Sequence, residues 1–267
     1  MNKIYERYVG VLVLLPIFIL IFIGGQYLKF LTLILSLIGL YEFYTILKAK
    51  NYHTFNIVSY AFTIIYFLTS KNLSTDKFLL ILIAFVAICL SIPVFNLKHN
   101  FIEAALTIFG FLYVTLMFSL IPKIEAKDFG NYFVWLVFIS SWGSDTFAYY
   151  FGRIFGRNKL CPKVSPKKTV EGAIGGLIGS ILGCLLYGII IYKFGVHINL
   201  YNYLIIGLIG GILSQIGDLS ASIIKRYLEV KDYGKIIPGH GGILDRFDSI
   251  LFVSSVVYFY LTFVVGL

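Results

Sequence analysis

Charged residues are scarce in this chain. They make up 13% of its 267 residues, whereas a globular protein has about 25%. Hydrophobic residues make up 59%, and the mean hydropathy is +0.89. This composition excludes a soluble domain. The apolar runs are long and continuous instead of short and alternating, which argues against a transmembrane β-barrel. We therefore expect an all-α, polytopic membrane protein.

Cysteine and several catalytic motifs are also scarce or absent. The three cysteines, Cys89, Cys161 and Cys184, stand apart without CxxC spacing, so neither a disulfide framework nor a zinc site is indicated. The chain contains no GxSxG and no GxxxxGK[ST] motif, which excludes a nucleophile elbow and a P-loop. The net charge of +9 indicates contact with anionic lipid and a cytoplasmic bias of the loops, and we expect no nucleic-acid partner.

Long apolar runs are what the chain does contain. They predict about nine spans, at residues 9–24, 29–47, 56–70, 78–95, 101–121, 131–151, 171–193, 201–221 and 250–267. The first run lacks an A-x-A-like cleavage site, so we expect a retained helix instead of a cleaved signal. Without a linker or an internal repeat, we expect one membrane domain over 1–267. Within it, 1–129 is expected to be scaffold or dimer region, and 130–267 to hold the catalytic helices and cytoplasmic loops.

The distribution of Lys and Arg predicts the orientation. With a cytoplasmic N-terminus, 16 of the 22 basic residues fall on the inner side and 6 on the outer side. The positive-inside rule therefore favours N-in and C-out. It also places the two most basic loops, 152–170 and 222–249, together on the cytoplasmic side.

Four aspartates interrupt the apolar pattern of the second half. Asp145 and Asp218 lie inside predicted spans, where a charged residue costs roughly 2.5–3.5 kcal/mol on insertion scales. Asp245 and Asp248 are three residues apart, and they share a helix face if the last helix begins there. One such aspartate could form a helix–helix hydrogen bond or pair with an Arg. A group of carboxylates is instead suited to Mg²⁺.

Basic residues and glycines accompany these acids. In SPKKTVEGAIGG, the lysines and hydroxyls precede a glycine-rich helix start, where backbone N–H groups can bind an anion. The alternative is a simple helix cap by Thr169 before Val170, and the two are compatible. For Lys163 and Lys235 we prefer the ordinary role of fixing topology and touching lipid. The glycines around His240 allow close approach of a ligand, or merely a tight turn.

Together these features favour phosphoryl or nucleotidyl transfer at headgroup level. Acids for a metal, cations for phosphate and glycines for close approach are the groups that such reactions use, because catalysis is mostly positioning and charge stabilisation.

One stretch carries a resemblance to a known family. From Ser222 to Asp248 the chain has the pattern S-x-x-K-R-x4-K-D-x-G-x3-P-G-H-G-G-x-x-D-R-x-D. This pattern resembles the signature of the phosphatidate cytidylyltransferases, also called CDP-diacylglycerol synthases. SDTFAYYFGRIFG around Asp145 and the SPKKTVEG loop are also similar to that family, so the resemblance covers roughly residues 130–267. We call Ser222–Asp248 the signature segment.

The resemblance implies the reaction of CTP with phosphatidate to give CDP-diacylglycerol and pyrophosphate. It implies a Mg²⁺ requirement, a monovalent cation such as K⁺ beside it, a homodimer, and a polar site open to the cytoplasm in the cell membrane. The expected metal ligands are Asp218 and Asp245, with Asp145 and Asp248 as further candidates. The expected catalytic residues are Asp218, Asp245, Lys225, Arg226 and Arg246. The expected substrate-binding residues are Ser165, Lys167, Lys168, Thr169, Lys231, Asp232, Gly239, His240, Gly241 and Gly242.

Two other functions stay open at this point. A CTP-using lipid kinase, such as a polyprenol kinase, would release CDP instead of pyrophosphate. A transporter for an anionic solute also uses intramembrane acids and broken helices. The sequence has no paired repeat, and its charges gather on one side instead of at the midplane, which disfavours the transporter.

Overall fold

The computed structural model describes residues 15–70, 74–239 and 241–267. The chain divides into two compact units, and each is described by itself. The first unit comprises Met1–Ser119 and Asp232–Asp245, and the second comprises Leu120–Lys231 and Arg246–Leu267. Residues 232–245 of the signature segment, which we call the signature loop, therefore belong to the same unit as the N-terminal helices. The expected single domain over 1–267 stays a prediction.

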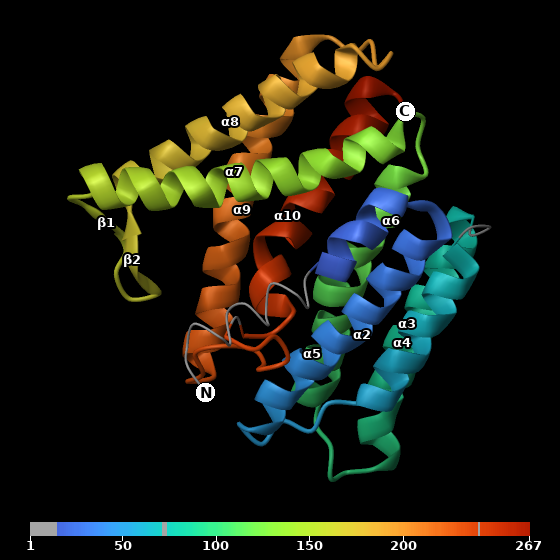
Figure 1. The fold of residues 1–267 in the computed structure, drawn as a ribbon. Helices are drawn as coiled ribbons and strands as arrows, with labels where there is room; N and C mark the ends of the chain where they lie inside the picture. Colours follow the sequence, from blue (N-terminus) through green and yellow to red (C-terminus); the bar gives the residue numbers. More distant parts are fainter. Residues whose placement is uncertain (1–14, 71–73, 240) are drawn as a thin grey trace. The chain divides into compact units, whose positions relative to one another are not determined.

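The first unit is built from helices that lie side by side (Figure 1). Residues 15–23 are helical, and the helices that follow are α2 (Gly25–Lys48), α3 (Asn56–Thr69), α4 (Thr75–Phe95), α5 (Phe101–Gly110) and the π-helical η2 (Phe111–Leu116). The start of α5 is fixed by a capping box. The Asn100 side chain accepts a hydrogen bond from the Glu103 N–H, and the Glu103 carboxylate accepts one from the Asn100 N–H.

The second unit holds the remaining helices and one β-hairpin. Its elements are α7 (Gly130–Phe155), β1 (Lys159–Cys161), β2 (Ser165–Thr169), α8 (Val170–Tyr192), α9 (Leu200–Tyr227) and η3 (Leu261–Val265). Helices α6 (Met117–Glu125) and α10 (Leu244–Tyr260) cross the boundaries between the units. Strands β1 and β2 are antiparallel. This hairpin adds a small sheet to the predicted all-α fold, in a stretch that we expected to be a loop.

Six helical segments of the described residues are long and apolar enough to span a membrane. They are Gly25–Lys48, Thr75–Phe95, Phe101–Glu125, Val170–Tyr192, Leu200–Tyr227 and Leu244–Val265, and Asn56–Thr69 is a shorter apolar helix. Helix α7 is not among the six, and its middle carries SSWGSD. A helical, multi-pass membrane protein is thus confirmed. The count of nine and the N-in, C-out orientation stay predictions, and residues 9–14 of the first predicted span lie outside the described residues.

A buried tyrosine links three helices of the first unit. The Tyr44 hydroxyl on α2 hydrogen-bonds the Ser59 hydroxyl on α3 and the Thr107 carbonyl on α5, each at 2.8 Å. Tyr44 has no exposed surface, so these bonds satisfy a polar group that cannot reach solvent. They fix the position of α2 against its neighbours.

Small residues bring the helices of the second unit close together. The Ser140 hydroxyl on α7 lies 2.8 Å from that of Ser180 on α8, which donates to the Gly207 carbonyl on α9 at 2.7 Å. A Cβ added to Gly179 would lie 2.5 Å from the Gly143 carbonyl oxygen, so α7 and α8 pack almost backbone to backbone. Close contact through small residues is typical of helices that associate within a membrane.

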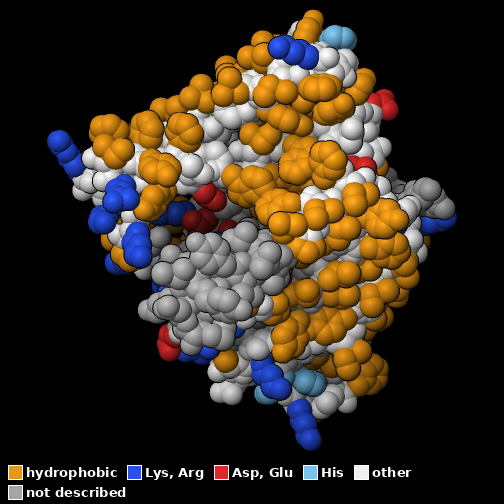
Figure 2. Space-filling view, viewed as in Figure 1, with side chains coloured by type: hydrophobic (Ala, Val, Ile, Leu, Met, Phe, Trp, Pro, Cys, Tyr) orange, Lys and Arg blue, Asp and Glu red, His pale blue; other side chains and the backbone are white. Residues whose placement is uncertain are grey.

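The surface of each unit supports insertion in lipid. Hydrophobic side chains cover most of the visible face (Figure 2). Residues such as Phe22, Ile57, Leu97 and Phe95 are among the most exposed. Lys and Arg side chains gather over the hairpin β1–β2, where an anionic headgroup layer would meet them.

We predict that Tyr44→Phe destabilises the protein by about 1–3 kcal/mol, because the buried Ser59 hydroxyl and Thr107 carbonyl each lose a hydrogen bond. The measurement is the midpoint of thermal unfolding in detergent. The control is Tyr41→Phe on the same helix, since Tyr41 is 58% exposed and its loss of a hydroxyl should be nearly neutral. Equal shifts for the two variants would contradict the prediction.

Candidate functional site

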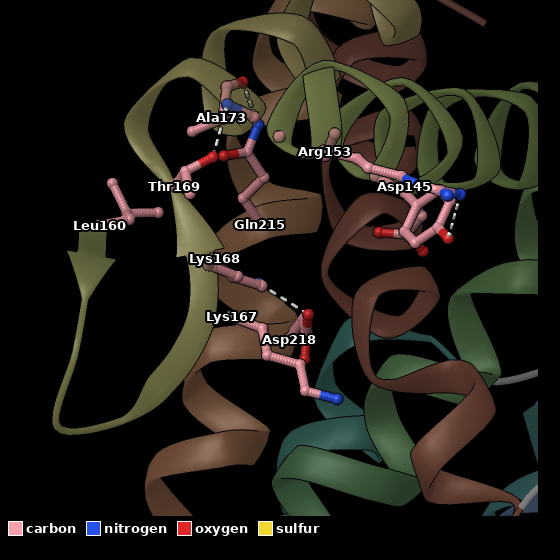
Figure 3. Close-up of a pocket in the computed structure, with 13 residues that line it drawn as sticks. Asp145, Arg153, Leu160, Lys167, Lys168, Thr169, Ala173, Gln215 and Asp218 are labelled. Carbon is pink, nitrogen blue, oxygen red and sulfur yellow. Dashed lines mark hydrogen bonds and ion pairs between the residues drawn. The ribbon is translucent and has the colours of Figure 1, made fainter. Parts of the chain in front are cut away.

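A cavity of about 420 Å³ opens in the second unit. It is lined by residues of α7, of the hairpin, of the start of α8 and of the second half of α9 (Figure 3). The lining residues are Asp145, Ala148, Tyr149, Gly152, Arg153, Leu160, Lys167, Lys168, Thr169, Gly172, Ala173, Gln215 and Asp218. Five of the predicted site residues thus meet at one place: Asp145, Lys167, Lys168, Thr169 and Asp218.

Helix α7 contributes its residues through the helical repeat. Asp145, Tyr149 and Arg153 follow one another at intervals of four, so they share one face of the helix. Arg153 Nη1 lies 3.4 Å from the Tyr149 hydroxyl. An acid and a base are therefore placed along the same wall, two turns apart.

The hairpin contributes the lysines. Strand β2 carries Lys167 and Lys168 and ends at Thr169, whose hydroxyl accepts a hydrogen bond of 3.1 Å from the Gly172 N–H. Helix α8 begins at Val170, so the predicted helix cap by Thr169 is confirmed. Helix α9 is held against the start of α8, because the Gln215 amide on α9 donates to the Ala173 carbonyl on α8 at 2.9 Å.

An ion pair joins strand β2 to helix α9 in the cavity wall. Lys168 Nζ lies 2.6 Å from Asp218 Oδ2, and the side chains are 26% and 32% exposed. Figure 3 shows Lys168 reaching from β2 toward Asp218 on α9. The partly exposed pair contributes little to stability, but it places a cation and a carboxylate side by side in the cavity wall.

Two further acids lie close to Asp218. The carboxylates of Asp145 and Asp248 are near enough to interact electrostatically with that of Asp218 and with each other. Asp248 is buried, and its Oδ1 accepts the Ser249 N–H at 2.7 Å. Arg246 is within electrostatic reach of Asp145, and Lys225 of Asp248. The second unit therefore gathers three acids and several bases.

The donor chemistry of these acids suits a hard divalent cation, which takes carboxylate oxygens. Across residues 15–70, 74–239 and 241–267, however, no three His, Cys, Asp or Glu side chains are arranged to hold a metal ion. In this arrangement Lys168 supplies the positive charge beside Asp218. The assignment of Asp145, Asp218, Asp245 and Asp248 as metal ligands stays a prediction.

Some of the predicted phosphate-binding residues have other contacts. Arg226 Nε donates to the Val164 carbonyl at 3.3 Å, which ties the end of α9 to the turn of the hairpin. Ser165 and Lys231 are not among the residues that line the cavity. Their roles, and that of Lys225, stay predictions, and His240 lies outside the described residues.

The signature loop in the first unit contacts the Asp245 side chain through its backbone. Oδ2 of Asp245 accepts hydrogen bonds from the Tyr233 N–H at 2.8 Å and the Gly242 N–H at 3.0 Å. Ile237 N–H donates to the Gly241 carbonyl at 2.8 Å. Gly239 and Gly241 have φ of 71° and 85°, a conformation that favours glycine. The predicted tight turn is therefore present, and Asp245 is oriented by two backbone donors.

An acid from the N-terminal half also contacts this loop, and our sequence analysis did not identify it. The carboxylate of Glu42 on α2 accepts the N–H groups of Ile243 and Leu244, each at 2.9 Å. Glu42 is 2% exposed. Asp145 was identified because it is an acid inside an apolar run. Glu42 is also an acid inside an apolar run, so the same argument would have identified it.

The cavity adds eight residues that the sequence analysis did not assign to the site, among them Tyr149, Arg153, Leu160 and Gln215. Arg153 had a sequence signal, because it follows Asp145 by eight residues and so lies on its face of the helix. Leu160 and Gln215 had none, since their place depends on how the hairpin and α9 fold against α8.

Comparison with known proteins shows the family to which the chain belongs. Residues 5–264 match the model of the family described as "Cytidylyltransferase family". The chain is 37% identical over 248 residues to a phosphatidate cytidylyltransferase of Staphylococcus saprophyticus, with 92% of each chain covered. Proteins of the same name from Staphylococcus haemolyticus and Staphylococcus aureus are each 36% identical over the same length and coverage. The chain belongs to the cytidylyltransferase family.

Proposed function

We propose that this protein transfers the cytidylyl group of CTP to phosphatidate, giving CDP-diacylglycerol and pyrophosphate in phospholipid synthesis. The relatives bear the name of this activity over 92% of the chain. The observation that carries the proposal is the cavity in the second unit, where Lys167, Lys168 and Arg153 stand beside Asp145 and Asp218. Anionic substrates and a divalent cation require this mixture of charges.

The reaction needs little covalent help from the protein. The phosphate of phosphatidate is already an anionic nucleophile, so its oxygen attacks the α-phosphorus of CTP without a strong general base. The bond between the α-phosphorus and the oxygen bridging to the β-phosphate breaks, and pyrophosphate leaves in line. The work of the residues is to hold two polyanions together against their repulsion.

The cationic residues have separate parts in this proposal. Lys168 neutralises Asp218 in the free protein and can exchange that carboxylate for a substrate phosphate. Lys167 lies next to it on β2. Arg153 lies on α7 with its guanidinium beside the Tyr149 hydroxyl, and a guanidinium matches the oxygens of a phosphate. We assign Arg153 to the phosphate of the lipid, because the apolar side chains of Ala148 and Leu160 line the same cavity.

Mg²⁺ is the cofactor that this chemistry calls for, and Asp218 and Asp245 are our proposed ligands, with Asp145 and Asp248 in support. When bound, it offsets the charge that develops on the phosphate oxygens. The N–H groups of Tyr233 and Gly242, which donate to Asp245, orient its carboxylate, as outer hydrogen bonds do for metal-binding carboxylates. A K⁺ ion beside Mg²⁺, a homodimer, and a site facing the cytoplasm from the cell membrane complete the proposal.

A product assay tests the reaction directly. Purified protein in lipid, given CTP, phosphatidate and Mg²⁺, should release one pyrophosphate for each CDP-diacylglycerol formed. The same preparation given a polyprenol should yield no CDP. Release of CDP with a phosphorylated lipid would establish a kinase instead, and the absence of any chemistry would favour a transporter.

Asp218→Asn should lower Mg²⁺-dependent transfer about 100-fold or more while leaving the fold intact. The activity should fall because a metal ligand is lost. The stability should change by less than about 1 kcal/mol, because the pair with Lys168 is partly exposed. The control is Asp128→Asn, at an exposed aspartate of the same unit. Near-wild-type transfer by Asp218→Asn would remove Asp218 from the metal site.

Arg153→Gln should raise the KM for phosphatidate about 10-fold with little change in the KM for CTP, because one charge-assisted hydrogen bond to the lipid phosphate is lost. The measurement uses a constant total lipid surface with varied phosphatidate. Arg157→Gln is the matched control, since Arg157 is exposed and does not line the cavity. If both variants raise the KM for phosphatidate equally, the loss of positive surface charge explains the effect, and not a contact of Arg153 with the lipid phosphate.

A further inference from the structure

Glu42 is an ionisable residue in the last third of α2, and its carboxylate contacts the signature loop. We propose that Glu42 is a positioning residue, which holds the segment 234–244 in the shape that presents Asp245 to the reaction. An acid in a predicted membrane span is costly unless it is paired, and here the partner is the backbone of that loop. Its contact with Leu244 joins residues 202 positions apart in the sequence.

The hydrogen bonds have the geometry of a helix cap supplied from another helix. Oε1 accepts from Ile243 and Oε2 accepts from Leu244, at 2.9 Å each. Leu244 is the first residue of α10, and the first N–H groups of a helix have no partner within it. A negative charge is also favourable at a helix N-terminus. Glu42 therefore fixes where α10 begins, directly before Asp245.

Two glycines of the signature segment leave room for this carboxylate. A Cβ at Gly242 would lie 2.5 Å from Oε1 and 2.6 Å from Oε2 of Glu42, and a Cβ at Gly234 would overlap Oε1. Neither glycine has a positive φ, so space and not backbone conformation demands the missing side chain. We expected the glycines near His240 to admit a ligand; Gly242 instead admits Glu42.

The same loop orients Asp245. The N–H of Gly242 donates to Asp245 Oδ2 at 3.0 Å, while the Cα side of Gly242 faces Glu42. Gly242 thus lies between the carboxylates of Glu42 and Asp245 and contacts both. A shift of the loop away from Glu42 would move a donor of Asp245. Helix α2 cannot follow easily, because Tyr44 ties it to α3 and α5.

The effect of losing this contact can be tested from either side. Glu42→Gln keeps the shape, but an amide can accept only one of the two N–H groups and sets its own NH₂ against the other. Gly234→Ala leaves the charge and displaces the carboxylate. The matched control is Glu103→Gln, since Glu103 is also 2% exposed and also accepts two backbone N–H groups, those of His53 and Asn100.

Two measurements are made on each full-length variant in lipid. Amide hydrogen exchange over residues 233–245, without substrate, reports the loop itself. The Mg²⁺ concentration for half-maximal cytidylyl transfer reports the consequence. Only this second measurement rests on the proposed function. A wild-type protein without transfer would refute the proposed reaction, while the exchange data would still judge Glu42.

Glu42→Gln and Gly234→Ala should each speed exchange at Ile243 and Leu244. Each should also raise the half-maximal Mg²⁺ concentration about 10-fold, because a shifted loop moves the Gly242 N–H, which is a donor to the proposed metal ligand Asp245. The double variant should be no worse than the poorer single one, because both act on one contact. Glu103→Gln should leave both measurements as in the wild type, even where it lowers the unfolding temperature.

The proposal is overturned if Glu42→Gln exchanges at the wild-type rate and keeps the wild-type Mg²⁺ dependence. It is also overturned if Glu103→Gln reproduces the changes, since general loosening of the unit would then account for them. If Glu42→Gln does not fold, Gly234→Ala decides the matter alone by the same two measurements.

Discussion

A carboxylate removed from water needs a donor or a cation close by, and this requirement governs the acids of both units. Glu103 takes the N–H groups of His53 and Asn100, and Glu42 takes those of Ile243 and Leu244. Each carboxylate reaches a loop that lies elsewhere in the sequence, Glu103 through His53 and Glu42 through Ile243 and Leu244. The apolar surroundings make these bonds worth more than they would be in water, and make their loss costly.

The kind of partner separates the acids that build the protein from those that are available for chemistry. Backbone N–H groups cannot leave a carboxylate without unfolding a loop, so Glu42 is committed to structure. Asp218 is neutralised by a lysine side chain that is 26% exposed, and a lysine can turn to another anion by rotating its bonds. Asp245 lies between these cases, because two N–H groups hold one of its oxygens, as suits a preorganised ligand.

The sequence predicted what depends on short spacing. The helical membrane fold followed from apolar runs, the start of α8 from Thr169, and the family from the fixed positions between Ser222 and Asp248. The grouping of Asp145 with Asp218 followed from the cost of charge in an apolar run. The hairpin β1–β2 was not predicted, since Pro162 marks a turn without showing that the flanking residues pair, and Pro166 within β2 argues against a strand.

Long-range contacts account for what was missed. Nothing near Glu42 in the sequence refers to a loop about 200 residues later, and nothing in the loop shows that Gly234 and Gly242 surround a side chain. A pattern of fixed glycines invites the interpretation that a ligand must approach the backbone. The contacts of Glu42 show that a side chain of the protein itself can impose the same requirement. Some fixed positions of the signature therefore shape the loop, which leaves the acids and bases of the loop and the hairpin as our proposed ligand-binding residues.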